Sequence, residues 1–320
     1  MRRRLVARLW QSLIVVFIVT TISFFLIRLV PGDPFSYEDP HITPEIRARW
    51  RAQFGYDRPL IEQYVRYIGS AAHGQLGYSI RARESVASVV GRAVPRTLLL
   101  TGLALALSLV LGVIIGVLQA VHRNGWFDRI SSGVLLTLYS LPDFWGALMA
   151  MLIFAFWWPV LPPGRMVDPL LHDYMSPLAA AVDRLRHLIL PVGSLTLMIM
   201  AGITRYQRAA LLDILPADYI RTARAKGVSE RGVIWRHALR SALAPMIALL
   251  GVMFPALLGG ALFVEKVFNW PGMGLVAAQA IGASDYDVVV ATVVIGSVMV
   301  VLGNLIADVL HAAVDPRVRE

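Results

Sequence analysis

Six apolar stretches of this 320-residue chain contain no Asp, Glu, Lys or Arg. A helix that crosses the roughly 30 Å hydrocarbon core of a bilayer needs about 20 residues, because each residue adds only ~1.5 Å. The stretches have about this length, which predicts an all-α integral membrane protein with six transmembrane helices. They are Leu9–Ile27, Thr97–Val121, Phe144–Gly164, Leu188–Thr204, Ser241–Val264 and Val288–Ala307.

Three of these stretches need comment. The third is expected to begin earlier, near Ile130, with Pro142-Asp143 as an interruption. The fourth is short, and its flanking residues can extend it to the length of a span. The first follows an Arg cluster, as a signal peptide does, but it is longer than the usual core of ~7–15 apolar residues and no small-x-small cleavage site follows. We therefore expect Leu9–Val30 to be a retained first span.

The formal net charge of +9 lies on alternate hydrophilic segments. Residues 1–8, 122–129, 205–240 and 308–320 together carry all of it, while the charges of the intervening segments cancel. Lys and Arg concentrate on the cytoplasmic side of membrane proteins. The pattern therefore predicts that both termini are cytoplasmic, and it argues against nucleic acid as the partner of the basic residues.

The chain is expected to divide into four parts. Residues 1–30 form a cytoplasmic tail and the first span, 31–95 an extracytoplasmic subdomain, 96–310 a five-helix core, and 311–320 a cytoplasmic tail. The subdomain is expected to fold because it contains two helical patterns with aromatic residues. The first, TPEIRARWRAQFG, starts at Thr43 or Pro44 and ends at Gly55, and the second is RPLIEQYVRYIGSAAHGQL.

The segment 205–240 is basic, lies between two apolar stretches and contains the pattern DYIRTARAKGVSERGVIWRHALRSAL. Helix, glycine and helix with many Arg also describe a DNA-binding helix-turn-helix, but the flanking spans leave no room for a separate three-helix domain. A solvated loop that only sets topology is the plainest interpretation. A short helix with a break, presented at the membrane surface, is also suited to dock into a groove on another protein.

The chain resembles the binding-protein-dependent ABC importer permeases over nearly its whole length, and in particular the B-type subunit of the dipeptide, oligopeptide and nickel branch. The resemblance rests on short sequences that keep the order of the family. They are TISFFLIRLVPGDPF, YDRPLIEQYVRYIG with GQLGYSI, VPRTLLLTGLAL, LPDFWG, DYIRTARAKG with RHALRSAL, GGALFVEKVFNWPGMG and DPRVR.

The resemblance implies a type I ABC importer permease fold that forms half of a translocation pathway. It implies three kinds of protein partner: a second, homologous permease, two cytoplasmic ATPase subunits and an extracytoplasmic solute-binding protein. It also implies contact with membrane lipid. No cofactor is expected in this chain, because ATP and Mg²⁺ would be bound by the ATPases. The loop that contacts the ATPase would comprise Asp218, Tyr219, Arg221, Thr222, Ala223, Arg224, Lys226, Gly227, Arg236 and His237.

The loop departs from the general signature of the family, which runs Glu-Ala-Ala, three residues, Gly, nine residues and Ile-x-Leu-Pro. With Gly227 at the glycine, only Ala223, Gly227 and Leu239 agree, and Arg221 stands at the Glu position. The sequence is similar to the form that the peptide branch uses. Gly227 is expected to allow a tight turn, because positive φ costs glycine little.

Three polar residues of the apparent spans are candidate pathway or structural residues: Asp143, Glu265 and Asn304. A charge at mid-membrane costs about 2.5–3.5 kcal/mol, so Asp143 is either functional or marks a helix break near an interface. Glu265, beside Lys266, is expected to cap or pair at the outer end of the fifth span. Asn304 is expected to hydrogen-bond between helices.

The chain is not expected to be an enzyme. It contains no Gly-Lys of a phosphate-binding loop, no His-Glu-x-x-His zinc site, no Gly-x-Ser-x-Gly elbow and no Cys. The alternative function is a stand-alone ion-coupled transporter or channel, which would place ionisable residues within several spans. The cargo stays open among dipeptides, longer peptides, nickel chelates and glutathione-like compounds.

Overall fold

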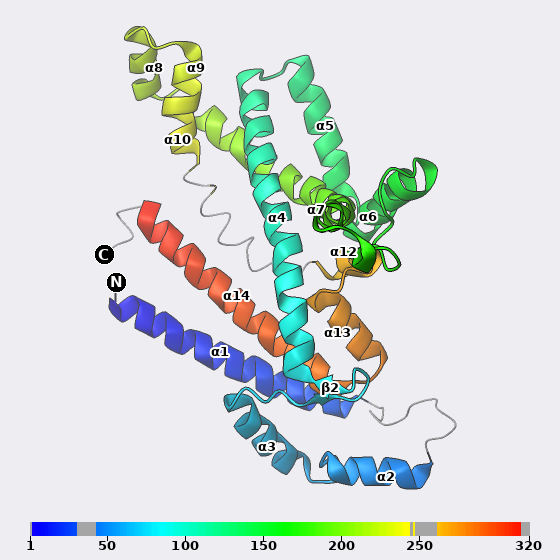
Figure 1. Cartoon of the computed structure of the whole chain (residues 1–320). Coiled ribbons are helices and arrows are strands. Elements are labelled where there is room, and N and C mark those ends of the chain that lie inside the picture. The colour runs from blue at the N-terminus through cyan, green and yellow to red at the C-terminus, as the bar shows by residue number, and fades with distance from the viewer. Residues whose placement is uncertain (1, 31–42, 244–245, 247–260, 315–320) are drawn as a thin grey trace. The chain divides into compact units, whose positions relative to one another are not determined.

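The computed structural model describes residues 2–30, 43–243, 246 and 261–314 (Figure 1). The described residues are mainly helical. The chain divides into two compact units, one of residues 1–97 and 271–301 and one of residues 98–270 and 302–320, here called unit 1 and unit 2. Most of the expected fifth span, Ser241–Val264, lies outside the described residues.

Four helices of the described part are long and apolar enough to cross a membrane. They coincide with the first, second, fourth and sixth apolar stretches, so the all-α membrane protein that the sequence predicts is confirmed, while the count of six stays a prediction. The helices are α1 (Arg2–Leu29), α4 (Val86–Val121), α7 (Pro177–Ile214) and α14 (Tyr286–Val314). With 36 and 38 residues, α4 and α7 are about 54 and 57 Å long and extend beyond the hydrocarbon core.

The third apolar stretch is bent. Helix α5 (Trp126–Ser140) is followed by α6 (Asp143–Met151) and the π-helix η1 (Leu152–Trp157), at an angle of 107° to α5. Leu141 has an extended backbone, with φ −80° and ψ 140°, as a residue before proline prefers. The interruption expected at Pro142-Asp143 is therefore confirmed.

Unit 1 contains both helices expected in the extracytoplasmic subdomain. Helix α2 (Pro44–Gln53) begins after Thr43, whose hydroxyl accepts a hydrogen bond from the Ile46 amide at 3.4 Å. Gly55 follows with φ +72°, and α3 (Leu60–Ala72) comes next. These two helix predictions are confirmed.

The rest of unit 1 is built around a short hairpin and two further helices. Strands β1 (Tyr78–Ser79) and β2 (Glu84–Ser85) pair antiparallel and lead into α4. Helix α13 (Met273–Gly282) precedes α14, and one core joins these helices to the start of α4. Its buried members are Val86, Val90, Ala93, Met273, Ala280, Val288, Val289 and Ala291.

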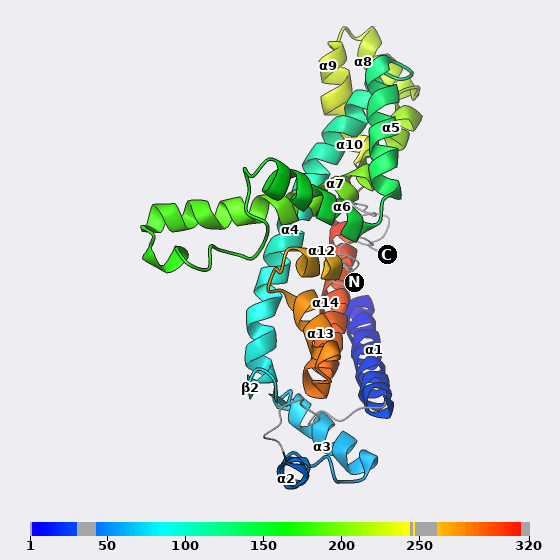
Figure 2. The same ribbon diagram turned by 90° about the vertical axis from the view of Figure 1, so that its right-hand side faces the viewer.

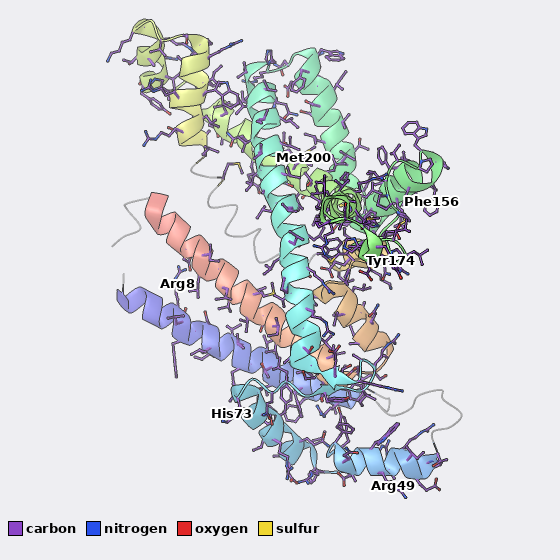
Figure 3. The ribbon with its side chains drawn as sticks, viewed as in Figure 1. Arg8, Arg49, His73, Phe156, Tyr174 and Met200 are labelled. Atoms are coloured by element: carbon purple, nitrogen blue, oxygen red, sulfur yellow. The ribbon has the colours of Figure 1, made fainter. Side chains whose placement is uncertain are left out.

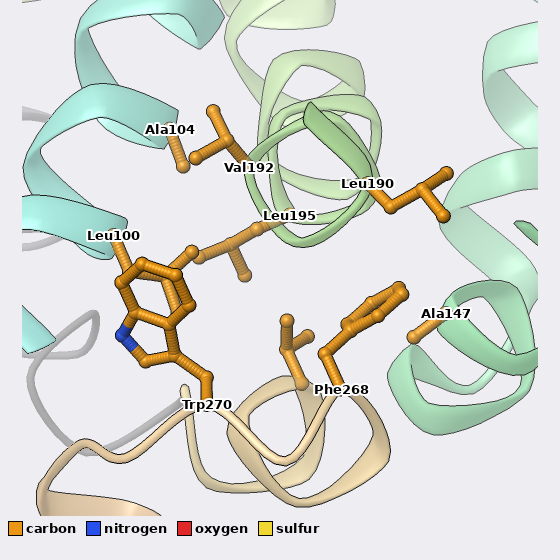
Figure 4. Close-up of a cluster of buried hydrophobic side chains, with 9 residues drawn as sticks. Leu100, Ala104, Ala147, Leu190, Val192, Leu195, Phe268 and Trp270 are labelled. Carbon is orange, nitrogen blue, oxygen red and sulfur yellow. The ribbon is translucent and has the colours of Figure 1, made fainter. Parts of the chain in front are cut away.

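The core of unit 2 is assembled from α4, α6, α7 and α12 (Leu262–Val267). Figure 4 shows the rings of Phe268 and Trp270, both fully buried, facing leucine side chains of the neighbouring helices. The amide of Arg165 donates to the Phe268 carbonyl at 2.6 Å, which fixes the loop after η1 to this core. In Figure 3, Phe156 projects outward, and the structure leaves it 63% exposed, whereas Met200 is buried.

Helix α7 begins well before its apolar stretch. Ser176 caps it by accepting from the Ala179 amide at 3.4 Å, the first turn is exposed, and the charged segment 183–187 follows before the apolar stretch. The preceding segment, with the 3₁₀-helix η2 (His172–Tyr174), folds back along these turns (Figure 2). The helix is longer than its uncharged stretch because capping and local contacts extend it into polar sequence.

Candidate functional site

The segment expected to contact a partner folds as a compact helical hairpin, here called the basic hairpin (residues 218–242). It comprises α8 (Asp218–Ala225), α9 (Glu230–Gly232), the π-helix η3 (Val233–Ala238) and α10 (Leu239–Ala242). Figures 1 and 2 both show α8 and α9 side by side at the turn.

An apolar stripe fixes the basic hairpin to the ends of the two long helices of unit 2. Ile220 and Val233 are fully buried and belong to one cluster with Val117 of α4 and Leu211 of α7. Burial of a large aliphatic side chain contributes about 1.5–3 kcal/mol. The hairpin is therefore packed on α4 and α7.

Gly227 ends α8 in a Schellman motif. Its φ is +79°, its amide donates to the Arg224 carbonyl at 3.0 Å, and the Val228 amide donates to the Ala223 carbonyl at 3.3 Å. Val228 packs against the cluster that contains Ala223, as the residue after such a cap commonly does. The tight turn expected at Gly227 is present, and its physical cause is the left-handed backbone of the cap.

The outer face of the basic hairpin is charged and exposed. Most of the residues predicted from the sequence lie on it: Asp218, Tyr219, Arg221, Thr222, Arg224, Lys226, Gly227 and Arg236. His237 is half-buried. Ala223 is only 8% exposed and faces the apolar cluster, so it supports the hairpin from within.

One ion pair crosses the turn of the basic hairpin. Arg224 Nη2 donates to Glu230 Oε1 at 2.7 Å and its Nε donates to Oε2 at 3.1 Å. These two donors hold the pKa of Glu230 below its ordinary value. Because both side chains are largely exposed, the pair orients the turn and contributes little to stability.

Trp235 is a surface residue that the sequence analysis did not single out. It is 47% exposed on η3, as is Tyr219 on α8. Its neighbours Val233 and Ile234 are buried. The sequence feature that could have identified Trp235 is a tryptophan in a basic segment, outside its apolar stripe. Exposed Trp and Tyr are enriched where proteins bind one another.

The three candidate pathway or structural residues lie in different settings. Asp143 is exposed and is the first residue of α6, directly after the bend. Glu265 is fully buried in α12, while the neighbouring Lys266 is exposed. Asn304 is exposed on α14. The position of Asp143 favours its interpretation as part of a helix break.

A further polar cluster joins the loop before α7 to that helix. Asp183 accepts from Nδ1 of His172 at 2.7 Å and lies 3.1 Å from Nδ1 of His187, and it also accepts from the Asp168 amide at 3.0 Å. Within the described residues, no group of three His, Asp or Glu could hold a metal ion. The cluster is best explained as a structural link that fixes the loop.

The polar centre of unit 1 is Arg28, near the end of α1. Its Nε donates to Gln63 Oε1 at 2.9 Å, its guanidinium lies 4.1 Å from the Phe24 ring centroid, and its Nη2 lies 3.8 Å from Asp287 Oδ1. The Tyr56 hydroxyl donates to the same carboxylate oxygen at 3.3 Å. Burial raises the pKa of Tyr56 well above its ordinary value. This network ties α1, α3 and α14 together.

Comparison with known proteins identifies two matching families that together cover nearly the whole chain. Residues 108–320 match the family described as binding-protein-dependent transport system inner membrane component. Residues 1–101 match the N-terminal region of membrane components of binding-protein-dependent transport systems.

Individual relatives are similar over almost their entire length. The oligopeptide transport system permease protein of Bacillus subtilis is 36% identical over 98% of this chain and 98% of its own. The dipeptide transport system permease protein of Escherichia coli is 35% identical over 94% of each chain. The glutathione transport system permease protein of E. coli is 34% identical over 98% of each. The family that the sequence motifs resemble is thereby confirmed.

Proposed function

The chain belongs to the family of inner membrane components of binding-protein-dependent transport systems, and we propose that it is a permease subunit of an ATP-driven importer of peptides. It is a multi-pass protein of the inner membrane. In the proposed arrangement it has six spans, has both termini in the cytoplasm and forms half of the translocation pathway. The long apolar helices and the alternation of charged segments support this topology.

The observation that carries the proposal is the construction of the basic hairpin. Its apolar stripe is buried against α4 and α7, while Tyr219, Arg221 and Lys226 are exposed on the other side. A short helix that is rigidly attached to two long helices can transfer the movement of a bound motor to them. We infer that this face seats in a groove of a cytoplasmic ATPase, whose closure on ATP converts the pathway from inward- to outward-facing.

The remaining partners are those that membership of this family implies. A second, homologous permease completes the pathway, two ATPase subunits bind ATP and Mg²⁺, and a solute-binding protein delivers cargo from outside. The chain itself supplies no catalytic residue. Unit 1 presents α2 and α3 on the extracytoplasmic side in this topology, where the solute-binding protein would arrive.

Peptides are the cargo that the relatives favour. Relatives named for oligopeptide, dipeptide and glutathione transport are similarly identical to this chain, and all three cargoes contain peptide bonds. Measuring what the cognate solute-binding protein binds, by calorimetry with a panel of dipeptides, longer peptides and nickel chelates, tests this part. Binding of nickel chelates and no peptide would overturn it.

The orientation of the basic hairpin can be tested by single-cysteine labelling, because the chain contains no Cys. Lys226→Cys should react with an impermeant maleimide only in inside-out vesicles. Arg66→Cys, on α3 and 60% exposed at its side chain, should react only in right-side-out vesicles. Reaction of both from the same side would contradict the topology.

The energy source separates the importer from the alternative of a stand-alone ion-coupled transporter. The chain should be reconstituted with and without its co-expressed ATPases, and uptake measured with internal ATP or with an ion gradient. We expect uptake only with the ATPases and ATP. Gradient-driven uptake by the chain alone would establish the alternative.

A further inference from the structure

Helix α3 of unit 1 has an apolar stripe, here defined as Ile61, Val65 and Ile68. These residues follow one another at the i, i+4 and i+7 spacing that places side chains on one face of a helix. Ile61 and Val65 are 66% and 63% exposed, and none of the 13 residues of α3, all of which the structure describes, is buried. The described part of the chain therefore leaves the stripe uncovered.

A neighbouring face of α3 is packed against α1. The hydroxyl of Tyr64 lies 2.8 Å from Oγ1 of Thr21. The centroid of the Tyr64 ring lies 5.4 Å from that of Phe24 and 5.2 Å from that of Phe25. The ring of Tyr67 also contacts Phe24, with 5.3 Å between the centroids. Figures 1 and 2 both show α3 beside the C-terminal part of α1, and these contacts fix its position there.

The contacted part of α1 lies within the apolar stretch that is expected to cross the membrane. Thr21, Phe24 and Phe25 all belong to Leu9–Ile27, and Arg28 is the first charged residue beyond it. At about 1.5 Å per residue, Phe24 lies about 6 Å and Thr21 about 10 Å inside the level of Arg28 along α1. An interfacial amphipathic helix inserts its apolar face about 5–10 Å into the boundary between headgroups and acyl chains. The contacts place α3 at this depth.

The order of residues around the two helices shows which way the stripe faces. Gln63 faces the polar centre of unit 1, where its Oε1 accepts a hydrogen bond at 2.9 Å. Around α3, Tyr64 comes next and the stripe follows on the far side from Gln63. Around α1, Ile22 and Leu26 follow Phe25, and they are 52% and 59% exposed. Because Tyr64 contacts Phe25, the stripe continues the exposed apolar face of α1.

The remaining face of α3 is charged. Oε1 of Glu62 lies 3.0 Å from Nη2 of Arg66 and 2.5 Å from Nη1 of Arg58, which precedes the helix. Two arginines and one acid leave this face with a net positive charge, which suits a layer of lipid phosphates. A soluble partner would have to displace lipid to reach the stripe at its depth, whereas acyl chains are already there.

We propose that α3 is an interfacial helix of the leaflet at the C-terminal end of α1. Its apolar stripe lies among the acyl chains, and its arginines lie among the headgroup phosphates. This placement requires only that α1 spans the bilayer. It does not depend on the proposed import activity or on which side of the membrane is cytoplasmic.

The test compares two adjacent residues of α3 that are almost equally exposed. Val65 is 63% exposed and the side chain of Arg66 60%, but they belong to different faces. Val65→Cys and Arg66→Cys are each made in the full-length chain, which has no other Cys, and given a nitroxide label. The labelled chain is studied in nanodiscs with cysteine-free partner subunits. The measured quantity is the ratio of relaxation by oxygen, which concentrates in hydrocarbon, to relaxation by nickel(II) ethylenediaminediacetate, which stays in water.

The ratio at residue 65 should be several-fold higher than at residue 66, and both variants should fold because both side chains are exposed. Equally low ratios would place the stripe in water. Weak relaxation by both reagents at residue 65 would mean that protein covers the stripe, and equally high ratios would mean that the charged face is also submerged. Each of these three results overturns the proposal. None of them decides whether uptake requires ATP, which the reconstitution assay measures separately.

Discussion

The guanidinium of Arg208 and the carboxylate of Asp128 form a two-pronged ion pair, with Nη2 2.8 Å from Oδ2 and Nε 2.9 Å from Oδ1. Asp128 lies in the first turn of α5, and Arg208 lies near the end of α7. The carboxylate side chain is 5% exposed and the arginine 29%. The pair therefore fixes the start of one helix to the end of another, next to the attachment of the basic hairpin.

Arg208→Gln should destabilise unit 2 by about 3 kcal/mol, because it leaves the Asp128 carboxylate buried without its ionic partner. The measurement is the thermal unfolding midpoint of the detergent-solubilised chain. The double variant with Asp128→Asn removes both charges and should recover part of the loss. If the double variant is as unstable as the sum of the single variants, the two side chains do not interact.

Gly227→Val should disable transport, because a β-branched residue cannot adopt the left-handed backbone of the cap without a cost of about 1–2 kcal/mol or more. The change should appear as ATP hydrolysis that is no longer stimulated by the loaded solute-binding protein. Membrane insertion should be normal, since the turn lies outside the spans. Gly133→Ala, on α5 with nothing within 4 Å of the added carbon, is the control and should transport normally.

Gly77 and Gly74 offer a matched pair of tests for the polar centre of unit 1. Both have positive φ, +99° and +78°, but only at Gly77 does an added Cβ collide, 2.5 Å from Oδ2 of Asp287. Gly74→Ala should cost about 1 kcal/mol of backbone strain. Gly77→Ala should cost about 2 kcal/mol more, because Asp287 must leave Tyr56 and the Tyr78 amide. Equal shifts in the unfolding midpoint would contradict the close approach.

The sequence predicted those helix ends and bends that depend on one residue and its immediate neighbours. Thr43 and Gly55 mark the ends of α2, and Gly227 ends α8, because caps depend on one side chain or one backbone angle. The bend at Pro142 was also foreseeable from the loss of a donor and the restriction on Leu141.

Contacts between distant residues were not foreseeable from one sequence. Asp128 and Arg208 are 80 residues apart, and His172 and Asp183 meet only because the loop before α7 folds back on it. Ala223, predicted as a member of the coupling loop, packs inward, because the face that an eight-residue helix buries is set by what lies beneath it. Helical periodicity in the sequence does not show which other helices α8 packs against.

The ion pair between Arg224 and Glu230 should respond to pH only under acidic conditions. The folded-state pKa of Glu230 lies below its ordinary value, so the stabilisation is complete above the ordinary value and is lost as pH falls through the folded one. A double-mutant cycle with Arg224→Gln and Glu230→Gln should give a coupling of about 0.2–1 kcal/mol, as for other exposed pairs. The coupling should be constant between about pH 8 and 6, because an ordinary Glu titrates near 4.3. A coupling that changes within this range would contradict the prediction.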